Sequence, residues 1–376
     1  MESDLGASVP KLGFGLMRLP MLGDAVDLPQ TMEMADRFLA AGFRYFDTAY
    51  GYLNGKSEAA VKTALVERYP REDFLLATKL PVWAGVKTKA AAEQMFYTSL
   101  ERTGAGYFDY YLLHNLGPGR TEKFEEYAIW DFLAQRRREG LIRHLGFSIH
   151  DSAQALDRVL TAHPEAEFVQ LQINYADWES PVIQSRRCYE TARAHGKPVI
   201  VMEPVKGGTL STLPPRAAAP LLALHPERSL SSWAIRYAAS LEGVLTVLSG
   251  MSDLAQMDDN LNTMREFQPL GEAEYAALEE TMSVLRATPT IPCTGCDYCA
   301  KDCPMHVGIS DHFRAMNLWK VYGNLPAARR NYEMEIRVGG HAPASACVGC
   351  GRCEAVCPQG IPIVEELRAV AAALEG

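Results

Sequence analysis

Eight short stretches rich in apolar, β-branched and aromatic residues recur through the first 250 residues, and helical patterns separate most of them. The predicted strands cover residues 11–19, 43–49, 74–80, 107–115, 142–150, 168–175, 198–205 and 243–250. Gly42, Gly104 and Gly140 stand where intervening helices should end, because glycine readily adopts the left-handed conformation that closes a helix. Eight strand–helix units in about 250 residues predict an α/β fold, the (β/α)8 barrel.

A doubly wound parallel sheet is the alternative fold. Such a sheet usually has fewer strands, and a glycine-rich, phosphate-binding turn follows its first strand and opens a helix. The corresponding stretch here is LGFGLMRLP (12–20), which lacks the third glycine of that motif and runs into a proline. The sequence therefore favours the barrel.

Two cysteine-rich runs near the end of the chain, residues 293–304 and 347–358, share the pattern C-x2-C-x2-C-x3-C-P and hold eight of its nine cysteines. Structural zinc usually takes two C-x2-C pairs separated by a longer loop, and disulfides are uncommon in a reducing cytosol. Bacterial ferredoxins use the pattern seen here, and in them the fourth cysteine of each run binds the other run's cluster. We therefore predict two [4Fe–4S] clusters, one held by Cys293, Cys296, Cys299 and Cys357 and the other by Cys347, Cys350, Cys353 and Cys303.

The predicted domains follow from these two features. Residues 1–266 form the barrel, residues 267–292 an amphipathic helix and a linker, and residues 293–376 a helix-rich, ferredoxin-like dicluster domain. The net charge of −9 argues against nucleic acid as a partner. No apolar run is long enough to span a membrane and the first residues lack a signal-peptide pattern, so we expect a cytoplasmic protein. Residues 304–346 are mildly basic, which would suit an acidic ferredoxin-type electron partner.

Polar side chains stand at the predicted strand ends, where the active sites of barrel enzymes lie. Asp47, Lys79 and His114 lie at the ends of the second, third and fourth predicted strands, and Tyr52 follows shortly after Asp47. A phenol is a poor acid–base catalyst at neutral pH unless its pKa falls, and the Lys79 ammonium would lower it. Asp47 would hold Lys79 in place, and His114 would donate to the reacting oxygen. These four residues are the predicted proton-transfer set.

Three motifs around these residues resemble the aldo-keto reductases: FDTAYGYLNGKSE (46–58), LATK (76–79) and YLLHN (111–115). Four later motifs, GFSIHD, VQLQINY, MEPVKGG and SGMSDLAQMDDNL, are similar to the cofactor-binding segments of that family. The resemblance covers the whole barrel, and with the tail it indicates the subgroup that has a C-terminal ferredoxin-like 2[4Fe–4S] domain. It implies an oxidoreductase that interconverts a carbonyl and an alcohol of a small or sugar-like molecule, with Tyr52 rather than Tyr50 as the general acid.

The resemblance also implies a nicotinamide dinucleotide at the barrel mouth. The side chains expected to bind its carboxamide are Ser148, Gln172 and Asn174. Glycines let backbone N–H groups approach phosphates, and the loops after the last two strands are the usual phosphate site of barrels. The residues expected to hold the phosphates and the adenosine are Lys206, Gly207, Gly208, Gly250, Ser252, Asp259 and Asn260. Residues 250–260 contain no Lys or Arg, which weakens the prediction of NADP and leaves NAD(H) or a different occupant open.

Nicotinamide and iron–sulfur clusters exchange electrons in different units, because nicotinamide carries a hydride and a [4Fe–4S] cluster one electron. Three arrangements reconcile them: a flavin in the barrel that divides electron pairs, clusters that pass electrons to a docked partner, or clusters that are structural. The leading hypothesis is a carbonyl–alcohol oxidoreductase with electron-transferring clusters. The alternatives are a plain NAD(P)H-dependent reductase with structural clusters and a non-catalytic electron-transfer or docking subunit.

Overall fold

The computed structural model of the chain describes residue 5 and residues 9–301 and 303–376. The chain forms two compact units. The first comprises Met1–Val205 and Ser232–Leu270, and the second comprises Lys206–Ser231 and Gly271–Gly376. The second unit therefore combines the cysteine-bearing tail with a segment from the middle of the chain, which the sequence assigns to the barrel.

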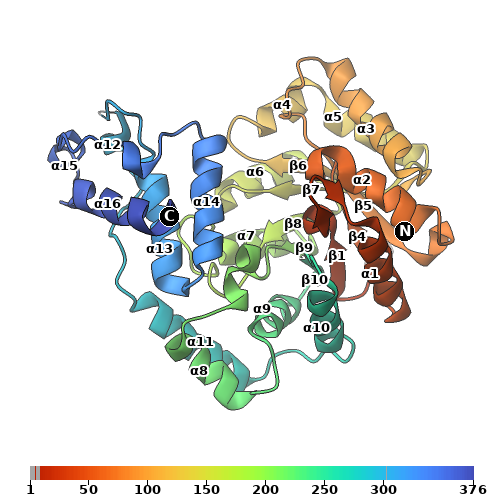
Figure 1. Ribbon diagram of the computed structural model, residues 1–376. Helices are drawn as coiled ribbons and strands as arrows, with labels where there is room; N and C mark the ends of the chain where they lie inside the picture. The colour runs from red at the N-terminus through yellow and green to blue at the C-terminus, as the bar shows by residue number, and fades with distance from the viewer. Residues whose placement is uncertain (1–4, 6–8, 302) are drawn as a thin grey trace. The chain divides into compact units, whose positions relative to one another are not determined.

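Eight parallel strands close into a barrel in the first unit (Figure 1). The order around the barrel is β1, β10, β9, β8, β7, β6, β5 and β4, so the first strand pairs with the last. The strands are β1 (Leu12–Gly15), β4 (Tyr45–Asp47), β5 (Leu75–Leu80), β6 (Phe108–Leu116), β7 (Ile142–Ile149), β8 (Phe168–Gln172), β9 (Val199–Met202) and β10 (Val244–Ser249). Each overlaps one of the eight predicted segments, and the predicted fold class is confirmed. β2 (Met21–Leu22) and β3 (Ala25–Val26) form a separate two-stranded sheet.

Helices connect the barrel strands, and their ends follow the capping rules. They are α1 (Leu28–Ala40), η2 (Tyr52–Gly55), α2 (Lys56–Val61), α3 (Lys89–Thr103), α4 (Thr121–Glu126), α5 (Ile129–Arg138), α6 (Ala153–Ala162), α7 (Ser185–Ala194), α9 (Leu230–Ala239) and α10 (Leu254–Met264). α1 begins after Asp27, whose side chain accepts a hydrogen bond from the backbone of Gln30. α10 begins after Asp253, which caps the backbone of Gln256 in the same way. α3 ends at Gly104, which has a φ of 64°.

The interior of the barrel is filled by large side chains from several strands. Tyr110 on β6 packs between Tyr45 on β4 and Phe168 on β8, with ring centroids 5.0 and 5.3 Å apart. Gly146 on β7 lets the neighbouring strand approach closely, because a Cβ at this position would lie 2.5 Å from the carbonyl oxygen of Phe168. This packed interior leaves the strand ends as the place where polar side chains can meet.

The second unit is rich in helices, as predicted for the dicluster domain. Its elements are η5 (Lys206–Ser211), α8 (Pro215–Leu224), α11 (Glu272–Arg286), α12 (Tyr298–Lys301), α13 (Ile309–Tyr322), α14 (Leu325–Arg337), η6 (Ala344–Ala346), α15 (Arg352–Ala355) and α16 (Ile363–Leu374). Helices α8 and α11 pack together, and the Thr281 hydroxyl on α11 donates to the Ala217 carbonyl oxygen on α8 at 2.9 Å.

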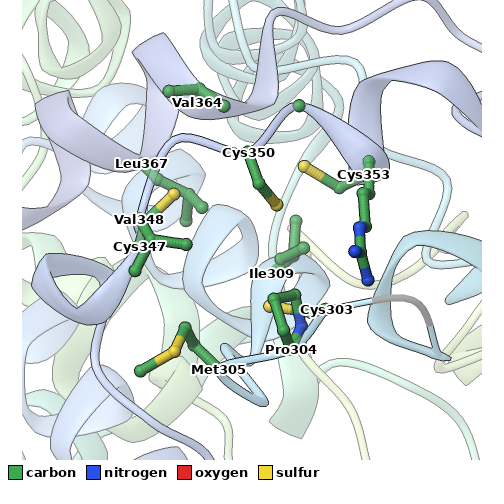
Figure 2. Close-up of a pocket in the computed structure, with 12 residues that line it drawn as sticks. Cys303, Pro304, Met305, Ile309, Cys347, Val348, Cys350, Cys353, Val364 and Leu367 are labelled. Carbon is green, nitrogen blue, oxygen red and sulfur yellow. The ribbon is translucent and has the colours of Figure 1, made fainter.

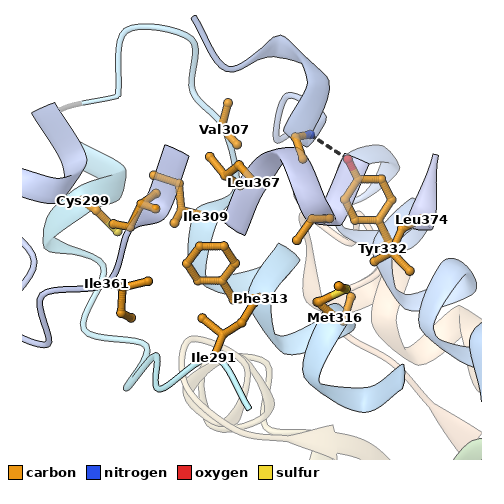
Figure 3. Packing of buried hydrophobic residues seen from close by; sticks show 14 of the residues in the cluster. Ile291, Cys299, Val307, Ile309, Phe313, Met316, Tyr332, Ile361, Leu367 and Leu374 are labelled. Carbon is orange, nitrogen blue, oxygen red and sulfur yellow. Dashed lines mark hydrogen bonds between the residues drawn. The ribbon is translucent and has the colours of Figure 1, made fainter. Parts of the chain in front are cut away.

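A separate hydrophobic core supports the cysteine runs (Figure 3). Phe313 and Met316 on α13 and Leu367 on α16 are buried in it together with Cys299 and other apolar side chains. At its edge the Tyr332 hydroxyl accepts a hydrogen bond of 2.7 Å from the backbone N–H at position 344. Among the described residues, no helix has both the length and the apolar character that crossing a membrane would require.

Candidate functional site

Four side chains converge where β4, β5 and β6 end. Asp47 is the last residue of β4, while Lys79 and His114 lie near the ends of β5 and β6. The Lys79 ammonium pairs with the Asp47 carboxylate and donates to the Thr48 carbonyl oxygen at 2.8 Å. It also lies 3.4 Å from the Tyr52 hydroxyl. The structure thus brings together the four residues that the sequence analysis grouped as a proton-transfer set.

The charged pair is fully enclosed, whereas the two rings are only partly buried. Asp47 and Lys79 are 3% and 0% exposed, whereas Tyr52 and His114 are only partly buried. The Tyr52 and His114 rings meet edge to face, with centroids 5.7 Å apart and an interplanar angle of 79°. Trp83 packs against His114 as well and donates its indole N–H to the His114 carbonyl oxygen at 2.9 Å. The phenol and the imidazole are therefore the members of the set that a small molecule can reach.

The surroundings set the protonation states of these groups. Burial raises the pKa of the Tyr52 phenol above its ordinary value, although the Lys79 ammonium acts in the opposite direction. The predicted effect of Lys79 on the phenol is thus present, but burial outweighs it in the free protein. Burial and the Lys79 charge lower the pKa of His114 well below its usual range. The imidazole is therefore neutral at neutral pH and has one N–H to donate.

The predicted carboxamide-binding side chains make hydrogen bonds within the protein. The Ser148 hydroxyl accepts from the Asn115 backbone N–H at 2.8 Å. The amides of Gln172 and Asn174 both donate to the same carboxylate oxygen of Asp177, at 3.1 and 2.9 Å. Sequence reasoning missed Asp177, although Asn favours local side-chain turns, and here the Asn174 Oδ1 accepts a hydrogen bond from the Asp177 backbone N–H at 2.8 Å. A nicotinamide bound here would share these amides with Asp177.

The predicted phosphate residues after β9 belong to the second unit. The helix η5 begins with Lys206, Gly207 and Gly208. The two glycines have φ values of 63° and 91°, which residues other than glycine rarely adopt. The Asn324 amide, at the start of α14, lies 3.4 Å from the Gly208 carbonyl oxygen and donates to the Thr212 hydroxyl at 3.2 Å. The loop is therefore held by a helix of the cysteine-bearing unit.

The loop after β10 lies beside a cation that the sequence analysis did not consider. The Ser252 hydroxyl donates to the Arg18 carbonyl oxygen at 2.8 Å, and the Arg18 side chain packs against Gly250. Asn260 is buried and donates to the Ser249 hydroxyl at 2.9 Å, while Asp259 lies in the same helix, α10. Arg18 follows β1, and it reaches this loop because the closed barrel pairs β1 with β10.

Three cysteines of the second run and one of the first line a common pocket (Figure 2). They are Cys347, Cys350, Cys353 and Cys303. The remainder of the lining is largely apolar and includes Met305, Ile309 and Val348. None of the nine cysteines, all of which the structure describes, forms a disulfide. Four free thiols around one hollow have the donor chemistry that a [4Fe–4S] cluster requires.

The first run has a reciprocal neighbour from the second. The Cys293 thiol has a raised pKa, mainly because of burial, and its neighbours Cys296 and Cys357 act in the same direction. Burial also raises the pKa of the Cys299 thiol to about 11, and Cys293 adds to this effect. Cys357 therefore lies near the first run although it follows the second. Cysteines of the two runs therefore lie close together, and two clusters that exchange their fourth ligand remain a prediction.

The barrel carries a carboxylate, an ammonium, a phenol and an imidazole at its strand ends, and eight clustered thiols follow it in the chain. Together these features define an oxidoreductase built on a (β/α)8 barrel. Comparison with known families makes this specific. Residues 11–282 match the Aldo/keto reductase family, and residues 292–361 match the 4Fe-4S dicluster domain. The chain therefore belongs to the aldo/keto reductase family and carries a 4Fe-4S dicluster domain after the barrel.

Individual relatives are distant. An aldo-keto reductase from Mycolicibacterium smegmatis is 33% identical over 144 residues, which is 38% of this chain, and the match spans about half (47%) of that protein. An uncharacterized oxidoreductase from Bacillus subtilis is 24% identical over 74% of this chain and 93% of its own. Among solved structures, an aldo-keto reductase from Bacillus halodurans (holo form) superposes with a TM-score of 0.58 at 26% identity, covering 74% of this chain and 94% of that one. One from Klebsiella pneumoniae in complex with NADPH has the same score at 22% identity, covering 72% and 90%, and shares the fold.

Proposed function

We propose that this protein interconverts a carbonyl group and an alcohol of a small molecule, with Tyr52 as the general acid and base. The observation that carries the proposal is the contact of Lys79 with both Asp47 and the Tyr52 hydroxyl, beside the His114 ring. A buried ion pair without these neighbours would need no role beyond stabilising the fold. Here a phenol and a neutral imidazole lie beside the pair, and these two groups can transfer a proton to a carbonyl oxygen and orient it.

In the reducing direction, Tyr52 donates its hydroxyl proton to the carbonyl oxygen as negative charge develops there. A bound NAD(P)H supplies the hydride for the carbonyl carbon, so the products are the alcohol and NAD(P)+. The Lys79 ammonium stabilises the phenolate that remains, and Asp47 keeps Lys79 charged and oriented. The neutral His114 orients the carbonyl oxygen with its N–H. In the oxidising direction the phenolate takes the proton of the alcohol.

Several residues would hold the nicotinamide dinucleotide. Ser148, Gln172 and Asn174 would meet its carboxamide, in competition with their present partners. The aliphatic part of the Arg18 side chain packs against Gly250 in the loop after β10, and we assign its guanidinium to a phosphate of the dinucleotide. The other residues proposed for the phosphates and adenosine follow β9 and β10. They are Lys206, Gly207, Gly208, Gly250, Ser252, Asp259 and Asn260. A flavin stays the alternative occupant.

We infer that the tail binds two [4Fe–4S] clusters and passes electrons to a ferredoxin-type partner. The four thiols around one hollow support the first of these statements. When bound, each cluster carries a single electron, so a pair of clusters matches the two electrons of one alcohol. The rival is a purely structural pair of clusters. Anaerobic purification, iron and sulfide analysis and identification of the released organic cofactor distinguish the cases, because released flavin favours electron splitting and NAD(P) alone favours the plain reductase.

The decisive variant is Tyr52→Phe, assayed anaerobically with a panel of small aldehydes and ketones and with NADH and NADPH. We expect kcat to fall at least ~100-fold, because the general acid is lost. Tyr50→Phe is the matched control, since the Tyr50 ring packs on Arg102 outside the set. Iron content and melting temperature should not change in either variant. Equal activity of Tyr52→Phe and wild type would exclude the proposed role and favour a docking subunit.

A further inference from the structure

The loop between β6 and α4 carries a cation, Arg120, that forms no ion pair with any residue that the structure describes. Arg120 donates from Nε to the Asn115 carbonyl oxygen at 2.7 Å. Within the part of the chain that the structure describes, no carboxylate pairs with its guanidinium, whereas Arg71 elsewhere in the barrel pairs with Asp109. The guanidinium therefore keeps its charge and its remaining N–H donors for another acceptor.

A glycine makes this position of the guanidinium possible. A Cβ at Gly117 would lie 2.3 Å from Nη2 of Arg120 and 3.2 Å from its Cζ, so any larger residue would displace the side chain. The same Cβ would lie 3.2 Å from the carbonyl oxygen of His150, which follows directly after β7. The guanidinium thus folds back over its own loop to lie beside the end of β7, at the rim where the proposed active site opens.

Arg120 lies close to the proposed catalytic imidazole. Its Nε bonds the carbonyl oxygen of Asn115, the residue that follows His114. Its charge acts after burial, Lys79 and His150 to lower the pKa of His114, and after burial to lower the pKa of His150. The His150 side chain forms a hydrogen bond with Gln172, a proposed cofactor ligand. The residues proposed for the dinucleotide phosphates follow β9 and β10, whereas Arg120 follows β6. Its position therefore fits the substrate rather than the phosphates of the cofactor.

We propose that Arg120 binds an anionic group, a carboxylate or a phosphate, on the carbonyl substrate of this enzyme. The inference rests on the proposed function, because it names the substrate class of that site. A guanidinium holds carboxylate and phosphate oxygens in a planar, two-point contact, and its partial burial strengthens the interaction. Hydrogen bonds to a charged group of this kind correspond to about 10- to 100-fold in binding. The substrates that fit are oxo acids and phosphorylated aldehydes or ketones.

The test compares matched pairs of substrates on the anaerobic holoprotein: pyruvate with methyl pyruvate, and glyceraldehyde 3-phosphate with glyceraldehyde. In at least one pair, the wild type should have a higher kcat/KM for the anionic substrate than for the neutral one. Whichever pair shows this preference tells whether the bound group is a carboxylate or a phosphate. In Arg120→Gln the ratio of anionic to neutral kcat/KM should fall about 10- to 100-fold, chiefly through KM. Arg138→Gln, which removes the same charge from the exposed end of α5, should leave the ratio unchanged.

A binding measurement separates this inference from the proposed function. Oxamate and inorganic phosphate are titrated calorimetrically into wild type, Arg120→Gln and Arg138→Gln. Binding that Arg120→Gln alone abolishes would support the anion site even if no carbonyl compound were turned over, in which case only the proposed function fails. Turnover of carbonyl compounds with no preference for anions, or binding that Arg120→Gln leaves intact, would overturn the inference and leave the proposed function standing.

Discussion

At the scale of single residues, the acid–base behaviour depends on how far each group is enclosed. Burial raises the pKa of Tyr52 and lowers that of His114 well below 6.5. The phenol is then protonated and the imidazole neutral throughout the neutral range. We predict that kcat/KM for carbonyl reduction is flat from about pH 7 to about pH 9 and falls only above the ordinary tyrosine value of about 10. Alcohol oxidation, which needs the deprotonated phenol, should instead rise with pH over this interval.

The profile is checked by steady-state kinetics in both directions with constant ionic strength. His114→Gln is the control, since it retains a neutral N–H donor and should retain the flat region. A wild-type limb near the ordinary histidine pKa of about 6.5 that disappears in His114→Gln would contradict the lowered pKa of the imidazole.

At the scale of elements, the barrel depends on the close approach of β7 and β8. We predict that Gly146→Ala lowers the free energy of unfolding by about 1–3 kcal/mol, because its methyl group would meet the Phe168 carbonyl oxygen and ring at 2.5 and 2.8 Å. Gly51→Ala is the matched control in the same unit, since no atom lies within 4 Å of the position that its methyl group would take and its φ is negative. Urea unfolding of both variants measures the difference, and equal midpoints would show that the strands can separate without loss.

At the scale of the whole molecule, the proposed cluster sites would link the two cysteine runs through their fourth members. We predict that Cys303→Ser and Cys347→Ser each remove one cluster, and that the double variant loses no more iron than either single variant, because both thiols serve the same site. Adding Cys293→Ser to Cys303→Ser should remove the second cluster as well, because Cys293 serves the other site. Cys188→Ser is the control, since Cys188 is buried in the first unit.

Iron and acid-labile sulfide per chain, measured anaerobically, decide this prediction. If each run instead held its own cluster, the pattern would reverse: Cys293→Ser with Cys303→Ser would remove one cluster, and Cys303→Ser with Cys347→Ser would remove both.

The residues at the strand ends could be predicted from sequence because strand periodicity and the strand–helix repeat are both visible in short stretches. Periodicity places Lys79 and His114 near the ends of strands, and parallel strands of one barrel bring those ends together. Arg18 was not predicted because it approaches Gly250 only when β1 pairs with β10, and these two strands stand at opposite ends of the barrel sequence. Nor does a local pattern reveal that Arg120 lacks a carboxylate partner among the described residues, since that depends on which acidic side chains fold within reach.

The loop that follows β9 has a consequence for any attempt to dissect this protein. Ending the chain before Cys293 would remove Asn324, which anchors Gly208 and Thr212. A chain ended before α11 would also lose Thr281, which bonds α8. Residues 206–231 would then keep their covalent place between two barrel segments without the helices against which they pack. The cysteine-bearing unit therefore includes residues 206–231, which lie within the region that matches the aldo/keto reductase family, so removal of the tail would leave a piece of that region without its packing partners.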